Sequence, residues 1–433
     1  MPNLRPNSTS YFHSFEPNTN DLVHSMDYNS LGEPILRAKL SGIDTTAKNR
    51  VQVSTQSIAL FSSTIYSDEP GVWDRSTALG GTVSYNTVAG GTELKVTSTV
   101  DSEAVVQSRR VMPYIPGRGM EVAMAIQYND SRVGIRRRVG VFDELNGMYF
   151  EQDETGEYYV VIRSDVSGTV VNTRVARSNW NGAKFDGTEP NGITANPNTI
   201  QMFVIEYDWY GAGQVKFNYI INGYKYTVHT FNHANVLTTT FIRTPNLPVR
   251  YEIKNVTGAE GIHELHKWGV SVIQEGAGDV GNIGRAGDVI SPIGGTTLGN
   301  TGVFSPLIAI RLKITRLAGV VIPYAYQAAS TSNALMYHKL TSDPTLTGGT
   351  WVSAGDDSFV EYNITATASS GGTILTAGFT PVADNGKSIL DPKVVWQMSR
   401  NSMGTTSQII CLEAAGDGNN IKALGSISWV EQR

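Results

Sequence analysis

Apolar and polar positions alternate over short segments along most of the chain. Between residues 51 and 275 one such segment follows another, and in "GMEVAMAIQYN" the side chains of Val122, Met124 and Ile126 fall on one face. A period of two residues is typical of a β-strand with one buried face. Asn-Gly pairs between segments mark tight turns. Because no segment carries apolar residues at helical spacing over a helix's length, we predict an all-β fold.

The pattern divides the chain into four segments. Residues 1–50 are rich in Asn, Pro and Ser and show little periodicity, which favours an extended N-terminal arm, either disordered or laid across a partner. Residues 51–275 and 303–433 each contain many short strand-like segments, so we predict two β-sandwich domains. Residues 276–302 contain nine glycines, too many for a packed element, and are interpreted as a linker.

Composition removes several functional classes. The net charge of −5 gives no whole-chain attraction to nucleic acid or to an anionic membrane. No run of eighteen apolar residues predicts a transmembrane helix, and the N-terminal residues lack the apolar core of a signal peptide, so we expect no Sec secretion. Cys411 is the only cysteine, which excludes an internal disulfide; its apolar surroundings predict a buried, inert thiol.

Two histidine-containing segments invite a metal interpretation. In "INGYKYTVHTFNHAN", the Asn222-Gly223 turn sets a hairpin register that places His229 opposite Lys216, which disfavours a cation. His233 would lie about 13 Å further along the strand, too far to share one zinc ion. In "IHELH", His263 and His266 are three residues apart rather than four, and we interpret the segment as a solvated turn. We predict no metal and no cofactor.

The segment "FVIEYDWYG" carries the strongest enzymatic signal. On a strand, Glu206 and Asp208 would share one face about 6.6 Å apart, and paired carboxylates serve as nucleophile and acid in retaining glycosidases. Sandwich-fold glucanases add a third carboxylate two residues later, where this chain has Tyr210 or Gly211. We therefore favour a solvent-facing polar strand face and predict no catalytic residue and no enzyme.

Other candidate residues suggest contacts rather than chemistry. Arg136, Arg137 and Arg138 are consecutive, which suits an anionic ligand or, as we favour, salt bridges at a subunit contact. The aromatic residues at expected strand ends are candidate interaction anchors: Trp180, Trp209 and Tyr210.

Several longer segments resemble virion proteins of tailed bacteriophages, especially cyanophages. They include "FDELNGMYFEQDETGEYYVVIRSD", "SNWNGAKFDGTEPNG", "FVIEYDWYGAGQVKFNYI" and "FIRTPNLPVRYEIKN". The resemblance implies a non-enzymatic structural protein with jelly-roll or concanavalin-like sandwiches, located in the virion and assembled in the bacterial cytoplasm. Its expected partners are other virion proteins and further copies of itself, in a tail fibre, baseplate, adaptor or head decoration.

Two alternatives remain beside this structural role. The first is a carbohydrate-binding adsorption module that contacts a host surface glycan. Its motivation is the abundance of Asn, Asp, Trp and Gly in expected loops such as the one around Trp180. The second is a glycoside hydrolase that uses Glu206 and Asp208.

Overall fold

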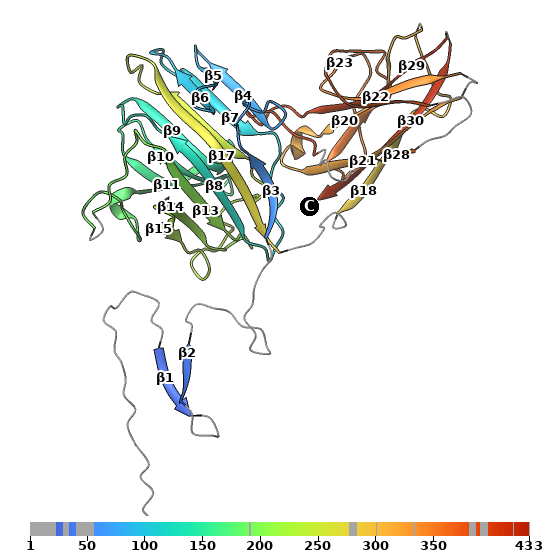
Figure 1. Ribbon diagram of the computed structural model, residues 1–433. Coiled ribbons are helices and arrows are strands. Elements are labelled where there is room, and N and C mark those ends of the chain that lie inside the picture. Colours follow the sequence, from blue (N-terminus) through green and yellow to red (C-terminus); the bar gives the residue numbers. More distant parts are fainter. Residues whose placement is uncertain are drawn as a thin grey trace, which may run out of the picture. The chain divides into compact units, whose positions relative to one another are not determined.

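A computed structural model gives the structure of residues 23–28, 34–39, 56–189, 192–276, 284–299, 301–331, 334–380, 387–389, 397–418 and 420–432. The chain divides into two compact units, residues 1–55 and 56–433. In the first unit the described strands pair as an antiparallel hairpin, β1 (Val23–Tyr28) with β2 (Pro34–Lys39). The rest of the predicted arm lies outside the described residues. The all-β prediction is confirmed (Figure 1).

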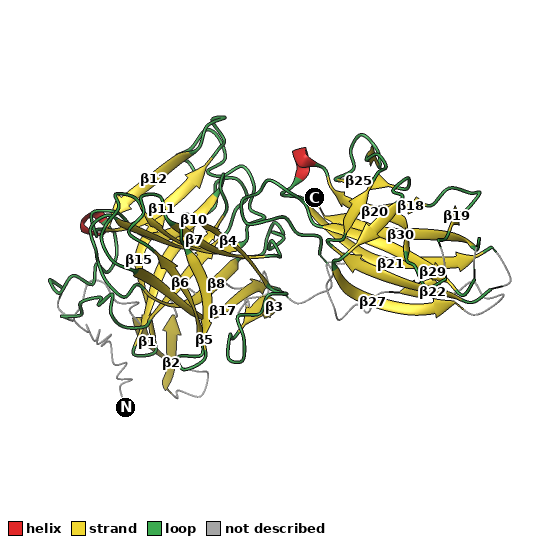
Figure 2. Cartoon of the chain, turned by 90° about the horizontal axis from the view of Figure 1, so that it is seen from above, coloured by secondary structure: helices red, strands yellow, loops and turns green. Residues whose placement is uncertain are grey.

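The N-terminal sandwich is built from two antiparallel sheets that face each other (Figures 1 and 2). The larger sheet has eight strands in the order β15-β14-β13-β8-β17-β6-β5, and β3 pairs with the second half of β17. Its strands are β3 (Gln56–Ser62), β5 (Thr82–Asn86), β6 (Gly91–Val96), β8 (Met120–Gln127), β13 (Gln201–Tyr207), β14 (Val215–Ile221), β15 (Tyr224–Phe231) and β17 (His263–Glu275).

The second sheet of this sandwich has seven strands in the order β12-β11-β10-β9-β16-β7-β4. Its strands are β4 (Trp73–Ala78), β7 (Glu103–Ser108), β9 (Ile135–Phe142), β10 (Gly147–Gln152), β11 (Tyr158–Ser164), β12 (Val171–Ala176) and β16 (Val249–Asn255). A short 3-10 helix, η1 (Arg177–Asn179), follows β12.

The core lies between these two sheets and is rich in aromatic rings. The Phe150 ring of β10 stacks on Phe203 of β13, with centroids 4.4 Å apart, and meets the edge of Phe217 of β14 at 5.1 Å. Alternation places the predicted face of β8, with Val122, Met124 and Ile126, in this core. The other face of β8 is turned away from the core, and its residues are partly exposed.

The C-terminal sandwich also has two principal sheets. One has the order β18-β30-β21-β28, with β19 also pairing β30, and the other has the order β24-β25-β20-β29-β22-β27. Their bounds are β18 (Arg285–Ile290), β19 (Thr296–Thr297), β20 (Ser305–Leu312), β21 (Val320–Ser330), β22 (Met336–Ser342), β24 (Val352–Ser353), β25 (Val360–Asn363), β27 (Thr373–Thr380), β28 (Lys387–Ile389), β29 (Ile409–Gly416) and β30 (Lys422–Gln432). A small ribbon of β23 (Thr345–Thr347) and β26 (Ala368–Ser370) and a 3-10 helix, η2 (Ile314–Arg316), complete it.

Part of the expected linker is folded. Strands β18 and β19 lie within residues 276–302 and both pair with β30, so the packed C-terminal unit begins earlier than we expected. Gly287 packs closely against the almost fully buried indole of Trp429. The lack of a side chain permits this contact, because a Cβ atom on Gly287 would collide with the indole. A high glycine content therefore marked close packing in β18 rather than an absence of structure.

The two sandwiches contact each other within this unit. Asp143 forms an ion pair with Arg400, and the Arg250 guanidinium donates to the Ser402 carbonyl at 2.6 Å. The Ser402 amide in turn donates to the Asp74 carboxylate at 2.7 Å. Cys411 is fully buried, as predicted, and burial raises the pKa of its thiol. None of the helices in the described part of the chain has the length and hydropathy needed to span a bilayer.

The β14–β15 hairpin follows the predicted register only near its turn. Pairing runs as expected from Ile221–Tyr224 to Asn218–Thr227, but a β-bulge then shifts it by one residue. Lys216 therefore faces Thr230, and the prediction that it faces His229 is wrong. His229 is buried and accepts a hydrogen bond from the Asn181 amide. A bulge adds one residue to one strand, which the apolar period alone does not reveal.

Lys267 of β17 points into the N-terminal core instead of toward solvent. Its ammonium lies 3.9 Å from the centroid of the Trp73 ring and 5.4 Å from that of Tyr251. Among the described residues no acceptor lies within hydrogen-bonding distance of its Nζ. Burial lowers the pKa of Lys267 to about 7, although Glu69 and Asp68 oppose the shift.

We predict that Lys267→Met raises the free energy of unfolding at pH 7 by about 1–4 kcal/mol, because it removes a buried charge without changing side-chain length much. The folded pKa is about 7 and the ordinary value is 10.5. Between these values the unfolded chain binds more protons, so wild-type stability rises with pH by about 1.4 kcal/mol per unit. Urea unfolding at pH 7, 8 and 9 measures this, and the advantage of the variant shrinks as pH rises. An advantage that does not change with pH, or no advantage, contradicts the prediction; the surface variant Lys254→Met is the control.

We predict that Gly287→Ala lowers the free energy of unfolding by about 1–3 kcal/mol, because the added methyl group must displace the Trp429 indole. Gly294→Ala is the matched control, since nothing lies within 4 Å of the methyl group it adds. Its effect should stay within about 0.5 kcal/mol. Equal midpoints for the two variants in urea unfolding would show that the contact does not constrain β18.

Candidate functional site

A groove of about 600 Å³ lies on the outer face of the eight-stranded sheet, within the size range of ligand sites. We call it the carboxylate groove. Strands β3, β8, β13, β14, β15 and β17 and the segments next to them supply its lining. Its charged side chains are four carboxylates and two ammonium groups: Glu121, Glu206, Asp208, Glu275, Lys216 and Lys225.

Glu121 and Glu206 face each other directly across the β8–β13 ladder. Residues directly opposite in antiparallel strands have Cβ atoms about 4.5–5.5 Å apart, so the two carboxylates share one small volume. Like charges in this arrangement repel. Lys225 offsets the repulsion, because its ammonium contacts Glu206 and lies 3.3 Å from Glu121. Partial burial lowers the pKa of Lys225, but the two carboxylates outweigh burial and the net shift is upward.

Asp208 follows the end of β13 and is held by a phenol. The Tyr114 hydroxyl donates to an Asp208 carboxylate oxygen and accepts a hydrogen bond from the Trp209 amide at 3.0 Å. Burial, together with the contact to Asp208, raises the pKa of Tyr114 to about 12. The phenol therefore remains a donor at neutral pH and fixes the orientation of this carboxylate.

Two further residues shape the open side of the groove. The Gly119 amide donates to Glu275 at 3.3 Å, and a Cβ at this position would lie 3.0 Å from the Glu275 carboxylate. Tyr210 has a positive φ of 36° and a side chain that is 61% exposed. It therefore offers an accessible ring beside the four carboxylates.

The three aromatic residues that we predicted as interaction anchors differ in how far they are exposed. Trp180 is only 4% exposed, and its Nε1 donates to the Val175 carbonyl. Trp209 packs against the core and donates from Nε1 to the Ile242 carbonyl. Of the three, only Tyr210 is largely exposed, and it lines the groove.

The three consecutive arginines do not form one patch, because neighbouring residues of β9 point to opposite faces. Arg138 pairs with Glu151 at 2.6 Å and with Glu252 at 3.2 Å, and Arg136 reaches Glu252 at 3.8 Å. Arg137 is fully buried on the other face, where it is paired with Asp130. All three therefore have carboxylate partners within the chain.

We predicted that the "IHELH" segment is a solvated turn, and this prediction is wrong. The segment forms the start of β17. His263 and His266 project from opposite faces of this strand. His263 lies 2.9 Å from Asp130, whereas His266 lies 2.9 Å from Glu264 on the outer face of the sheet. The helical spacing rule gave no information here because the segment is extended.

Sequence reasoning identified Glu206 and Asp208 but missed their neighbours. Glu121 belongs to the polar face of a strand that we had recognised, yet its position opposite Glu206 depends on which strands pair. Lys225, Glu275 and Tyr114 come from other strands or loops and carry no local motif. We had looked for a third carboxylate two residues further along the same strand. In the structure the additional carboxylate is Glu121, which lies opposite Glu206 on the neighbouring strand β8.

No protein-family model matches the chain, and no curated protein of similar sequence was found. Among solved structures, a glycoside hydrolase family protein from Mycobacterium thermorestibile matches with a TM-score of 0.36 and 10% identity, over 50% of this chain and 100% of its own. A pseudo beta-1,3-glucanase of Mycobacterium tuberculosis matches with 0.34 and 12%, over 51% and 99%. A Bacteroides ovatus GH16 protein in complex with a product matches with 0.31 and 12%, over 50% and 100%.

These comparisons contradict the prediction of a non-enzymatic virion protein. The similar structures are named as a glycoside hydrolase family protein, a pseudo beta-1,3-glucanase and a GH16 protein, so the predictions of a non-enzymatic structural role and of no enzyme are withdrawn. The expected virion partners and location stay predictions.

Proposed function

We propose that the chain is a carbohydrate-active protein that binds a glycan in the carboxylate groove and hydrolyses a glycosidic bond there. The observation that carries this proposal is the directly opposed pair Glu121 and Glu206, both of which line the groove. Retaining glycosidases use two carboxyl groups about 5–5.5 Å apart, one on each side of the scissile bond. Opposed positions on adjacent antiparallel strands provide a separation of this order.

The surroundings of the two carboxylates suggest different roles for them. Lys225 contacts Glu206 more closely than Glu121, which suits an ionised nucleophile at Glu206. Glu206 would attack the anomeric carbon while Glu121 protonates the leaving oxygen. Water would then release the sugar with Glu121 acting as base. Asp208, oriented by Tyr114, is placed to accept hydrogen bonds from sugar hydroxyls.

The charge of the groove also points to a class of substrate. With Glu121 protonated as the general acid, the other three carboxylates and the two ammonium groups leave a formal charge of −1. A polysaccharide of uronic acids would be repelled by this charge, whereas a neutral glycan would not. The exposed ring of Tyr210 offers an apolar face on which a sugar ring can pack. We therefore propose a neutral glycan as the substrate.

We predict that Glu206→Gln lowers turnover of a neutral polysaccharide by at least about 100-fold, because it removes the nucleophile while keeping side-chain volume. Release of reducing ends from a panel of neutral and uronate-containing polysaccharides measures turnover, and affinity electrophoresis measures binding. Glu260→Gln, which changes an exposed carboxyl outside the groove, is the matched control and should be fully active.

Different failures separate the parts of the proposal. Turnover that is equal in wild type and Glu206→Gln contradicts the assigned nucleophile. Binding without turnover in the wild type contradicts hydrolysis and leaves a glycan-binding groove. If no polysaccharide in the panel is bound or cleaved, the carbohydrate-active function is wrong.

A further inference from the structure

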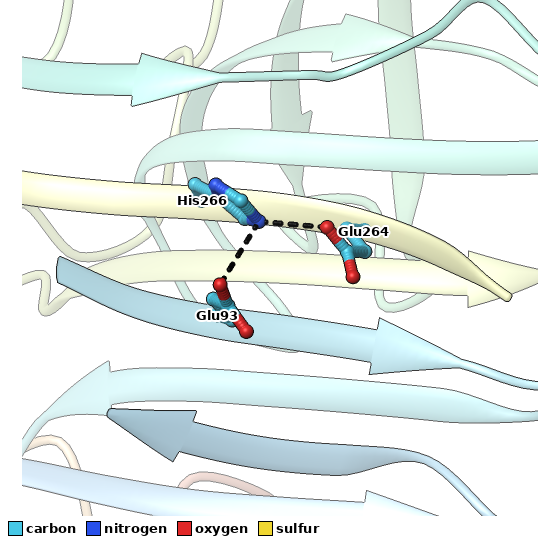
Figure 3. Close-up of side chains that lie close together, drawn as sticks. All are labelled: Glu93, Glu264 and His266. Atoms are coloured by element: carbon cyan, nitrogen blue, oxygen red, sulfur yellow. Dashed lines mark hydrogen bonds and ion pairs between the residues drawn. The ribbon is translucent and has the colours of Figure 1, made fainter. Parts of the chain in front are cut away.

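A second cluster of ionisable side chains lies on the outer face of the same sheet, away from the carboxylate groove. Figure 3 shows Glu93 of β6 and Glu264 and His266 of β17 turned toward one another. His266 pairs with Gln127 of β8, six residues along that strand from Glu121. Six residues of strand span about 20 Å, so the two groups of carboxylates are separate.

Three side chains from two strands bring ligand atoms together. His266 Nε2 lies 2.9 Å from Glu264 Oε2 and 3.7 Å from Glu93 Oε1. The side-chain amide of Asn129 lies 3.2 Å from both His266 Nε2 and Glu264 Oε2. Four ligands at about 2.1 Å in a tetrahedron are about 3.4 Å from one another. These four separations bracket this value, and the ligand atoms of Glu93, Glu264 and His266 all lie within 4.8 Å of one another.

We infer that Glu93, Asn129, Glu264 and His266 form a tetrahedral site for Zn²⁺. The Asn129 amide enters the site after a rotation that exchanges its nitrogen for its oxygen, which leaves the backbone in place. The ion then receives one imidazole nitrogen, two carboxylate oxygens and one amide oxygen. It joins β6 to β17 and the segment after β8, so its role is to stabilise this end of the sheet.

Lys95 supports the two carboxylate ligands without contacting the oxygens that face His266. Lys95 contacts the other oxygen of each carboxylate, Glu93 Oε2 at 2.7 Å and Glu264 Oε1 at 3.0 Å.

Asn86 supplies an outer hydrogen bond of the kind that orients metal ligands. It donates to Glu93 Oε1 at 2.5 Å, and its own oxygen accepts from the Val88 and Ala89 amides. These two amides fix the orientation of the Asn86 amide group. The Glu93 carboxylate is therefore held in place before any ion enters.

The donor set selects among common divalent ions. One imidazole and three oxygens at tetrahedral spacing suit Zn²⁺. Calcium requires six to eight oxygen ligands, whereas these side chains supply only three oxygens that Lys95 does not hold. With Lys95 included, the two carboxylates leave a formal charge of −1, so a divalent cation is attracted to the cluster.

The test uses the full chain after removal of metals with EDTA. Equilibrium dialysis is expected to give one Zn²⁺ per chain, and Zn²⁺ is expected to raise the midpoint of thermal unfolding. His266→Ala should weaken Zn²⁺ binding by at least about tenfold and abolish the rise. Asn129→Asp replaces the amide oxygen with a carboxylate oxygen and should bind Zn²⁺ more tightly than the wild type.

His263→Ala is the matched control, because it removes a histidine from the opposite face of the same strand. It should bind Zn²⁺ like the wild type, with folding of every variant checked by far-UV circular dichroism. Absence of bound Zn²⁺ in the wild type overturns the inference. Equal binding by His266→Ala and His263→Ala, or a stabilising effect of Ca²⁺ but not of Zn²⁺, overturns it as well.

Discussion

The packing of aromatic rings between the two sheets of the N-terminal sandwich constrains everything on its outer face. Phe150 lies against Phe203 and Phe217, and these contacts fix which side of β13 and β14 faces inward. Because successive side chains of a strand alternate, fixing Phe203 and Ile205 inside also fixes Glu206 outside. A shift of one residue would bury the glutamate and remove it from the groove. The core therefore positions the carboxylates without touching them.

The outer face of the larger sheet repeats one electrostatic arrangement at two places. Lys225 bridges Glu121 and Glu206, and Lys95 bridges Glu93 and Glu264. In each case an ammonium group offsets the repulsion between carboxylates from neighbouring strands. The two places differ in what else is present. The first lies in a groove large enough for a sugar chain, and the second adds an imidazole and an amide at metal-ligand spacing. The two proposals therefore rest on different chemical groups at the two places.

The local sequence pattern was sufficient to predict several strands and turns. It was insufficient to predict how these elements pair and pack with one another. The all-β class, the core face of β8 and the Asn222-Gly223 turn follow from periodicity and turn chemistry over a few residues. The β-bulge in the same hairpin did not, because an extra residue has no apolar signature. The glycine of β18 misled for a related reason: the Trp429 indole, against which Gly287 packs, is more than 140 residues away in the chain.

The sequence by itself determined the all-β class, the apolar face of strands such as β8, and that Glu206 and Asp208 lie on or beside one strand. The tertiary structure alone decided that Glu121 stands opposite Glu206, that Lys225 reaches both, and that His266 meets Glu93. The physical reason is that alternation is a property of one strand, whereas a site on a sheet depends on pairing and register. Those are set by burial of side chains from distant strands in a common core. Both candidate sites belong to the second kind.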